Sequence, residues 1–475
     1  MNNIYKNSVL YLIANFIING AGFLLLPLYT VIISPDEFGV IFLIEAAALF
    51  LSRTISLSLR GSINRFYFED KSKEAVTSMY TTIVTFLFIF SIVIYFILSL
   101  LYHPVSNALK IYNHKYLLLG LFISFLSVFY PLILSLLYAR EEGKKISVTI
   151  TIIGLISIGL NVLFVLNSED KIQGYLTALG ITAFLKFLIF IFYSIPYLKF
   201  SLKFTKISKY LKYGLHQLPS DISGLIITFA DRFMVNSMKG LQMTGIYSTG
   251  YKIGQANQII FDSINKAYVP FVFTKYGDLN ERNKGILSRT LLNLFALFTF
   301  ISIAAIVFHK EIIWLLDDRY KTSAIILAII LYSYLIDGYR FLFNPPLAYN
   351  VKFVKYKSII IVLSGILNII LNLILIPKYS VVGAAIATLA TFIIRLIFIM
   401  ILSRKAIKID YSYKQLLNVF IVSIIFLNLI FLKLNFVNFI IKSVLMISFI
   451  FILMKISSLK FSDIKGLMQK KLKAD

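Results

Sequence analysis

Long apolar stretches recur along the whole 475-residue chain and constrain its fold more than any other feature. A helix needs roughly 20 apolar residues to cross a bilayer, and about fourteen stretches of the sequence reach that length. They lie near residues 8–31, 38–60, 79–102, 116–138, 146–166, 174–195, 215–238, 244–271, 287–308, 322–346, 356–376, 382–403, 414–432 and 436–454. Hydrophobic residues make up 59% of the chain, whereas a soluble domain has about 45–50%. The sequence therefore predicts an all-α integral membrane protein.

Basic residues gather in alternate loops between these stretches, and this pattern predicts the orientation. Loops rich in lysine and arginine stay in the cytoplasm. The C-terminal tail is strongly basic and falls on the same side as the other basic loops. We therefore expect both termini to be cytoplasmic. The net charge of +25 is then mainly a topology signal, and nucleic acid is not an expected partner.

The sequence shows few features that are typical of an enzyme. It has no cysteine, and its four histidines lack the spacing of a metal site. The connecting loops are too short for a separate catalytic domain, and no P-loop lysine motif is present. We therefore expect no catalytic residues, no metal and no cofactor. An enzyme, such as a membrane polysaccharide polymerase, is therefore a less favoured interpretation of this chain.

Four matches in the same order indicate an internal duplication. The matched pairs are residues 62–67 with 263–268, Tyr138 with Tyr349, Asn161 with Asn372, and Gly174 and Lys186 with Gly383 and Arg395. Six candidate spans separate equivalent positions, so both copies share one orientation, and parallel repeats of this kind occur in transporters. We expect a six-helix lobe in residues 1–200, a second in 201–405, and an extra helix pair with a basic tail in 406–475.

Short motifs in both copies carry a family resemblance. They are Asn15 with Gly20-Ala21-Gly22 and Pro27, the loop Ser34-Pro35-Asp36-Glu37-Phe38-Gly39, Arg65-Phe66-Tyr67-Phe68-Glu69, Asp231-Arg232-Phe233 with Gly245-Ile246-Tyr247, and Asn372 with Gly383-Ala384-Ala385-Ile386-Ala387. Over residues 1–405 the chain resembles a polysaccharide flippase of the Wzx type. That family shares a superfamily with MATE drug exporters and lipid II flippases.

The resemblance implies a MATE-like fold, in which two six-helix lobes surround a central cavity that opens alternately to each side. It implies transport of an undecaprenyl-diphosphate-linked oligosaccharide to the periplasmic leaflet, for a surface polysaccharide such as the O-antigen of lipopolysaccharide. The expected location is the bacterial cytoplasmic (inner) membrane. Membrane lipids, a polysaccharide polymerase and chain-length regulators are expected partners. A MATE-type cation-coupled drug exporter and a lipid II flippase, which also has an additional helix pair, remain alternatives.

Charged residues inside the apolar stretches are the candidate site, because a charge at bilayer depth is costly unless it faces a cavity or a partner. Guanidinium and ammonium groups recognise phosphate well. The candidate diphosphate-binding cations are Arg53, Arg232, Lys252, Lys266 and Arg340. The candidate pairing or ion-coupling carboxylates are Glu45, Asp221, Asp262 and Asp337. Cations at least match carboxylates, which favours an anionic lipid over a lipophilic cation as substrate.

Arg53 is the strongest of these candidates. It lies deep in the second stretch, with Glu45 eight residues earlier on nearly the same helical face. Asp337 and Arg340 stand three residues apart and form either an internally neutralised pair or part of the substrate site. Lys186, equivalent to an arginine of the second copy, is interpreted as structural.

Other candidates keep a second interpretation. Lys266 lies near the cytoplasmic end of its stretch, where a long side chain reaches the interface. Arg232 forms, with its neighbour Asp231, either an ion pair at the rim or part of the cavity. Asn15 and Pro27 are gating candidates, because proline removes an intrahelical hydrogen bond and allows a helix to bend. A static kink is the alternative.

Overall fold

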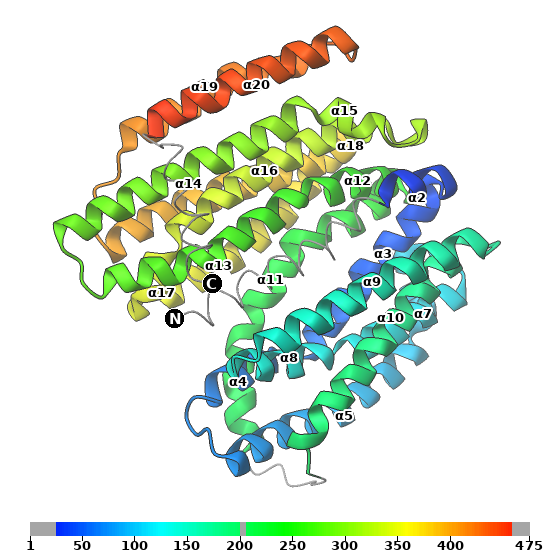
Figure 1. Cartoon of the computed structure of the whole chain (residues 1–475). Helices are drawn as coiled ribbons and strands as arrows, with labels where there is room; N and C mark the ends of the chain where they lie inside the picture. The colour runs from blue at the N-terminus through cyan, green and yellow to red at the C-terminus, as the bar shows by residue number, and fades with distance from the viewer. Residues whose placement is uncertain (1–24, 200–205, 458–475) are drawn as a thin grey trace. The chain divides into compact units, whose positions relative to one another are not determined.

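The computed structural model describes residues 25–199 and 206–457. Every regular element among these residues is a helix, as predicted (Figure 1). The chain forms two compact units. Of the described residues, the N-terminal unit comprises 25–199, 206–248 and 368–381, and the C-terminal unit comprises 249–367 and 382–457. The lobe boundary near residue 200, which follows the sequence repeat, stays a prediction.

The N-terminal unit contains the first helices of the chain. Its helices are α2 (Leu26–Ile32), α3 (Pro35–Ile55), α4 (Leu59–Phe66), α5 (Lys73–Leu100), α6 (Tyr102–Leu109), α7 (His114–Ser127), α8 (Tyr130–Ala139), α9 (Gly143–Asn167), α10 (Lys171–Ser194) and α11 (Ile207–Lys239). Side chains that accept a backbone N–H of the first turn stabilise helix starts. Ser34 and Glu37 form a capping box on α3, and Asp170 accepts a hydrogen bond from the Gln173 N–H at 3.0 Å to begin α10.

The C-terminal unit begins within α12 (Leu241–Gly254), where the boundary between the units falls. Its further helices are α13 (Ala256–Tyr276), α14 (Glu281–Val307), α15 (His309–Trp314), α16 (Ser323–Phe343), α17 (Pro345–Tyr349), α18 (Val351–Ala406), α19 (Tyr413–Leu427) and α20 (Phe436–Ser457). The middle of α18, residues 368–381, belongs to the N-terminal unit. Short 3-10 turns at Ile195–Tyr197, Asp318–Tyr320 and Asn428–Phe431 complete the described elements.

Ten helices among the described residues are long and apolar enough to cross a membrane. α18 counts once among them, although its 56 residues far exceed the roughly 20 that one crossing needs. Ser380, between the predicted stretches 356–376 and 382–403, has a non-helical backbone (φ 53°, ψ −139°). The prediction of a multi-spanning helical protein is confirmed, while the count of about fourteen spans stays a prediction.

Several predicted stretches are interrupted, among them 116–138 between α7 and α8 and 322–346 between α16 and α17. The second, expected at 38–60, divides into α3 and α4, and the left-handed residues Leu57 and Ser58 separate them. The eighth, expected at 244–271, divides into α12 and α13 at Gln255. Apolar length does not reveal such breaks, because leucine and serine usually avoid the left-handed region and so give no signal for it.

An apolar core within the N-terminal unit joins α5, α8 and α10. Its buried members include Tyr80, Phe129, Leu136 and Phe190. Tyr80 is fully buried, and its hydroxyl shares a 2.7 Å hydrogen bond with the Ser194 hydroxyl. A buried hydroxyl without a hydrogen-bond partner costs stability. The bond to Ser194 offsets this cost for Tyr80.

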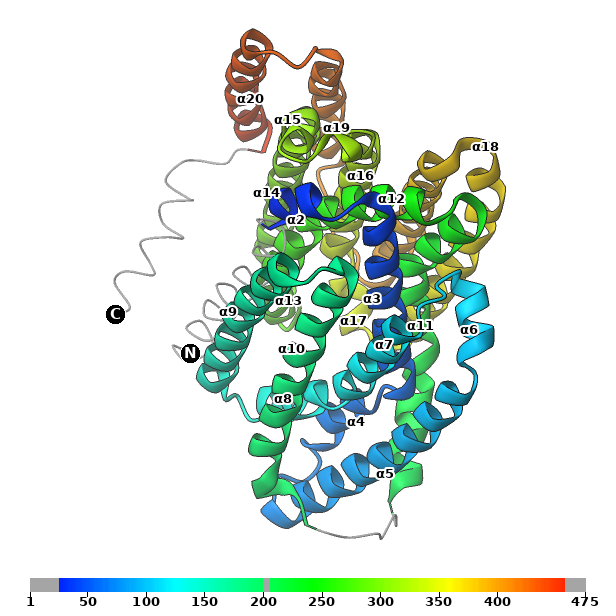
Figure 2. The same cartoon turned by 90° about the vertical axis from the view of Figure 1, so that its right-hand side faces the viewer.

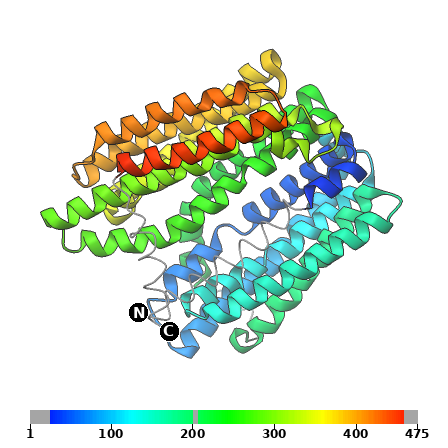
Figure 3. The same cartoon turned by 45° about the horizontal axis from the view of Figure 1, so that its top comes forward.

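The last helices form a pair fixed to the C-terminal unit. α19 and α20 lie side by side and pack on α14 (Figure 3). Lys442 of α20 is fully buried, and its Nζ donates a hydrogen bond to Glu311 Oε1 of α15 at 2.8 Å. Lys310 Nζ donates to the Ile430 carbonyl at 2.9 Å. Because breaking a buried ion pair is strongly destabilising, these contacts hold the pair in place.

Two glycines let α3 and α12 touch through their backbones within the N-terminal unit. A Cβ on Gly39 would lie 2.2 Å from the Leu241 carbonyl oxygen, and one on Gly245 would lie 1.8 Å from that of Pro35. Pro35 and Leu241 are equivalent positions of the repeat, and so are Gly39 and Gly245, because the same sequence interval separates the members of each pair. The contact is therefore symmetric between the two copies of the repeat, and it joins two of the family motifs.

Replacing either glycine by alanine should destabilise the protein, because a backbone carbonyl cannot move aside as a flexible side chain can. Overpacking of this kind costs about 1–3 kcal/mol. Gly159→Ala is the matched control, since nothing lies within 4 Å of an added Cβ there and alanine favours helix. The measurement is the apparent melting temperature in detergent. Equal melting temperatures for Gly245→Ala and Gly159→Ala would contradict the close contact.

Candidate functional site

A polar cavity of about 840 Å³ lies among α3, α4, α8, α10 and α11 of the N-terminal unit, which Figure 2 labels. This volume is typical of a ligand pocket. Its polar and charged lining residues are Ser52, Arg53, Arg60, Asn64, Arg65, Ser127, Tyr130, Ser135, Tyr138, Lys186, Tyr213, Gln217 and Asp221. Of the residues singled out from the sequence as binding candidates, the structure brings Arg53 and Asp221 together here. We call this space the cationic cavity.

A strained turn between α3 and α4 positions Arg53 and Arg60. Leu57 and Ser58 have φ values of 49° and 54°, and a left-handed conformation costs about 1–2 kcal/mol for each such residue. The Ser58 hydroxyl donates a hydrogen bond to Asp221 Oδ2 at 2.8 Å. A carboxylate from α11 thus holds the turn from which the two arginines extend.

Close packing of α11 on the same turn explains how that helix reaches it. A Cβ on Gly214 would lie 2.4 Å from the Leu57 carbonyl oxygen. The Ser62 hydroxyl donates a hydrogen bond to the Tyr210 carbonyl at 2.8 Å. Arg53 therefore lies in the last turn of α3, and not deep in a longer span as expected, because the helix ends where the turn begins.

The charge of the cavity is not balanced. Within the described part of the chain, the side chains of Arg53, Arg60 and Lys186 make no ion pair or hydrogen bond. Arg65 pairs loosely with Glu69, at 3.6 Å and with both side chains partly exposed. Asp221 is the one carboxylate that lines the cavity. An excess of guanidinium and ammonium groups with unused donors is suited to an anion such as phosphate.

Basic residues just beyond the cavity form ion pairs, unlike Arg53, Arg60 and Lys186. Between α8 and α9, Glu142 accepts hydrogen bonds from Arg140 Nε at 2.7 Å and Lys145 Nζ at 2.6 Å. Burial alone would raise the pKa of the Glu142 carboxyl, but the two cations outweigh it and lower that pKa below its ordinary value. Cations in this loop are thus neutralised by the protein, whereas those in the cavity are not.

Sequence reasoning assigned Lys186 a structural role and did not single out Arg60 as a binding candidate. The structure places both in the lining of the cationic cavity. A signal was present for Lys186, because it lies in the middle of an apolar stretch, where an ionisable residue is by default a functional candidate. Its equivalence to Arg395 concealed that signal, although the two side chains have different surroundings: Lys186 lines the cavity and Arg395 bonds to Asp337.

Glu45 and Arg53 do not form the pair that their shared helical face predicted. Glu45 Oε1 accepts a hydrogen bond from the Tyr175 hydroxyl at 3.1 Å. Tyr175 in turn packs edge to face on Tyr29. Glu45 does not line the cationic cavity, because two helical turns along α3 carry it toward α10 instead.

Asp231 and Arg232 of α11 are both buried and bonded within the protein. The Tyr247 hydroxyl donates to Asp231, whose other oxygen accepts from the Arg232 N–H at 2.8 Å. Arg232 Nη1 donates to the Thr228 carbonyl at 2.6 Å, and the guanidinium lies over the Phe229 ring. These contacts support the interpretation as a structural pair more than a role in binding substrate.

Asp337 of α16 is shared by two arginines in the C-terminal unit. Arg340 donates to it through Nε at 2.6 Å and Nη2 at 3.0 Å. Arg395 of α18 also donates to Asp337. All three residues are buried or nearly so, and each guanidinium lies over a neighbouring phenylalanine ring. Of the two interpretations of Asp337 and Arg340, this contact favours the internally neutralised one.

The remaining candidates lie outside the cationic cavity. Lys266 pairs with Asp262 at 3.1 Å, one turn apart on α13, with both side chains largely exposed. Such a pair contributes little stability. Lys252 is half-buried in α12. Pro27 lies in the first turn of α2, and Asn15 lies outside the described residues. Gating by this segment stays a prediction.

The hydrogen bond between Ser58 and Asp221 should contribute to the stability of the protein. Asp221→Asn keeps an oxygen that accepts the Ser58 hydrogen bond, whereas Asp221→Leu does not. Hydrogen bonds to charged groups contribute about 1.5–3 kcal/mol, so Asp221→Leu and Ser58→Ala should both lower the melting temperature, and Asp221→Asn should lower it less. If Asp221→Asn is as unstable as Asp221→Leu, the carboxylate does not act by holding the turn.

The cluster of Asp337, Arg340 and Arg395 should also be needed for stability. Asp337→Asn leaves two buried guanidiniums without a counter-charge, and breaking a buried pair costs about 3–5 kcal/mol. The variant should yield much less monodisperse protein in gel filtration than the parent. Asp262→Asn removes a carboxylate of an exposed pair and is the control, with little expected effect. Equal yields from both variants would refute a structural role for Asp337.

Comparison with solved structures gives the fold a known context. Lipid II flippase MurJ in an inward closed conformation is similar with a TM-score of 0.75 and 16% identity, over 96% of this chain and 97% of that chain. An inward-facing multidrug resistance MATE family transporter of the MOP superfamily is similar with a TM-score of 0.64 and 12% identity, over 84% and 94%. These likenesses show a shared fold, and the predicted MATE-like fold class is confirmed.

Comparison of sequences gives the family. An uncharacterised membrane protein of Methanocaldococcus jannaschii is 28% identical over 165 residues, which are 34% of this chain and 38% of that protein. The family model described as polysaccharide biosynthesis protein matches residues 4–276. That range covers more than half of the chain and includes every residue of the cationic cavity. The chain therefore belongs to the polysaccharide biosynthesis protein family, as its motifs predicted.

Proposed function

We propose that this protein is a flippase that moves an undecaprenyl-diphosphate-linked oligosaccharide to the outer leaflet of a bacterial cytoplasmic membrane, for a surface polysaccharide such as O-antigen. The observation that carries the proposal is the cationic cavity, in which Arg53, Arg60 and Lys186 form no ion pair with any described residue and outnumber the lining carboxylate Asp221. Membership in a polysaccharide biosynthesis family and a fold similar to a lipid II flippase support it.

The chemistry of the cavity fits a diphosphate attached to sugars. A diphosphate carries charges that hydrocarbon does not tolerate, and arginine binds phosphate oxygens through paired N–H donors. Hydroxyl and amide groups of Tyr130, Tyr138 and Gln217 line the same space and offer hydrogen bonds to hydroxyl-rich sugars. The protein thus replaces water around the head group, and the lipid chain does not have to leave an apolar environment. No step makes or breaks a covalent bond, so the proposed activity is not enzymatic.

A cation-coupled drug exporter is the second candidate, because the fold is also that of MATE transporters. A lipophilic cation needs an available carboxylate in its site. Asp221, the carboxylate that lines the cationic cavity, accepts a hydrogen bond from Ser58 and stands among several cations. The cavity therefore favours anions. Binding of tetraphenylphosphonium to purified protein, with no binding of inorganic diphosphate, would reverse this preference.

The proposal extends to location and partners. Both termini are proposed to be cytoplasmic, from the basic loops, and a polysaccharide polymerase and chain-length regulators are proposed to act next on the delivered oligosaccharide. Membrane lipids surround the exposed apolar faces. Lipid II is an alternative cargo, since it has the same diphosphate-linked chemistry as the proposed substrate.

Removing cavity cations should abolish function at unchanged protein levels. Arg53→Ala and Lys186→Ala should each fail to restore surface polysaccharide in a host whose own gene is deleted. In purified protein each should weaken binding of inorganic diphosphate by about tenfold or more, as expected for loss of a charge-assisted hydrogen bond. Isothermal titration at two salt concentrations measures this, since the affinity should fall as salt screens the charges.

Lys355→Ala is the matched control, because it removes an exposed cation of the C-terminal unit and leaves the cavity intact. It should complement as well as the parent chain. The proposal fails if surface polysaccharide is normal without the gene and no other transporter replaces it. It also fails if Arg53→Ala and Lys186→Ala both retain full complementation and full diphosphate affinity.

A further inference from the structure

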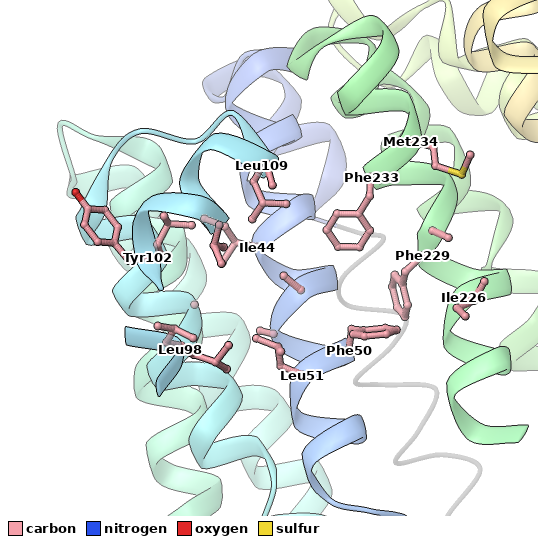
Figure 4. Close-up of a pocket in the computed structure, with 18 of the residues that line it drawn as sticks. Ile44, Phe50, Leu51, Leu98, Tyr102, Leu109, Ile226, Phe229, Phe233 and Met234 are labelled. Carbon is pink, nitrogen blue, oxygen red and sulfur yellow. The ribbon is translucent and has the colours of Figure 1, made fainter. Parts of the chain in front are cut away.

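A second, apolar cavity of about 610 Å³ lies within the N-terminal unit, among α3, α5, α6, α7 and α11. Figure 4 shows side chains of α3 and α11 reaching toward each other across it, with Phe50 on one side and Phe229 and Phe233 on the other. Nearly all its lining atoms are carbon. Among the described lining residues, the only side-chain heteroatoms are the Tyr102 hydroxyl and the Met234 sulfur. We call this space the apolar pocket.

The apolar pocket and the cationic cavity follow one another along the same helices. Residues nearer one end of each helix line the cationic cavity, and those nearer the other end line the apolar pocket. The lining changes between Leu121 and Ser127 on α7 and between Asp221 and Ile226 on α11. On α3 it changes near Leu51 and Ser52, and Leu49 also lines the cationic cavity. Three separate segments thus change from polar to apolar over one or two helical turns. Such a division matches a ligand with a charged head and an apolar chain.

We infer that the apolar pocket binds the first isoprenoid units of the lipid whose diphosphate occupies the cationic cavity. This rests on the proposed function of that cavity. A lipid of the cytoplasmic leaflet has its head at the interface and its chain toward the bilayer centre. The predicted orientation places the cationic cavity at the cytoplasmic ends of α3 and α11. The apolar pocket then lies where the chain of such a lipid extends.

The far wall of the apolar pocket is built by specific contacts. α6 carries Val105, Ala108 and Leu109 into the lining. Asn236 Nδ2 at the end of α11 donates a hydrogen bond to the Leu109 carbonyl at 2.7 Å. Lys110 Nζ donates to the Ser237 carbonyl at 3.1 Å. These bonds hold α6 on α11 and keep the pocket open between them and α3.

The apolar pocket should contribute position and selectivity more than affinity. A chain that moves from bilayer to pocket exchanges one apolar environment for another, so the hydrophobic effect supplies little drive. Close packing against ring and branched side chains instead distinguishes one chain shape from another. The most direct test therefore asks where the chain lies, and not only how tightly the ligand binds.

The probe is farnesyl diphosphate with a benzophenone on its terminal isoprene, added to the full chain in phosphatidylcholine nanodiscs. After illumination, mass spectrometry should find the label on lining residues of α3, α6, α7 and α11, and excess inorganic diphosphate should abolish this labelling. Ala47→Phe and Ala230→Phe fill the pocket from different helices, and each should lower the yield about tenfold. Phe192→Trp, on an exposed position of α10, is the control and should leave the yield unchanged.

Three other outcomes would each overturn the chain site or the proposed function. Inorganic diphosphate binding with label only on exposed positions such as Phe192 would overturn the chain site and leave the cationic cavity intact. Pocket labelling that diphosphate does not compete, and that a benzophenone fatty acid reproduces, would identify an ordinary membrane lipid as occupant and overturn the inference. Failure of inorganic diphosphate to bind at all would refute the proposed function first, and the chain site with it.

Discussion

The cost of placing charge in an apolar chain governs this structure. Two arrangements of buried charge occur among the described residues. In the C-terminal unit Asp337 neutralises two arginines, and Glu311 neutralises Lys442. In the N-terminal unit Arg53 and Lys186 line a cavity with no such partner. A charge in an apolar environment is costly unless it faces a cavity or a partner, and these cations have the first of these in place of the second; on this difference the proposed anion site rests.

The cationic cavity depends on a backbone conformation that is itself unfavourable. Two consecutive left-handed residues, Leu57 and Ser58, end α3 early. Strain of this kind persists only where the surroundings impose it, and it concentrates at functional sites. Here Asp221 bonds the turn and Gly214 lets α11 approach it. Asp221, the only carboxylate among the described lining residues, thus bonds the turn, and the described cations of the cavity outnumber it.

Much of the helical architecture was accessible from the sequence, because an apolar stretch of sufficient length has few alternatives in a membrane. Details of the site were less accessible. The second stretch was expected to continue to residue 60, since neither Leu57 nor Ser58 signals a left-handed turn. That error also displaced Arg53 toward the bilayer centre and paired it with Glu45 on helical spacing alone. Glu45 instead accepts a hydrogen bond from Tyr175, which belongs to a distant segment that local spacing cannot reveal.

The two copies of the repeat treat an equivalent cation differently. Lys186 and Arg395 occupy equivalent positions, each twelve residues after a matched glycine. Arg395 meets Asp337, but the spacing that relates Tyr138 to Tyr349 places Leu126 opposite Asp337. The first copy has no carboxylate there, so its cation stays unpaired. A single acidic residue thus separates a structural cluster from a candidate anion site, and sequence equivalence alone would have assigned both positions the same role.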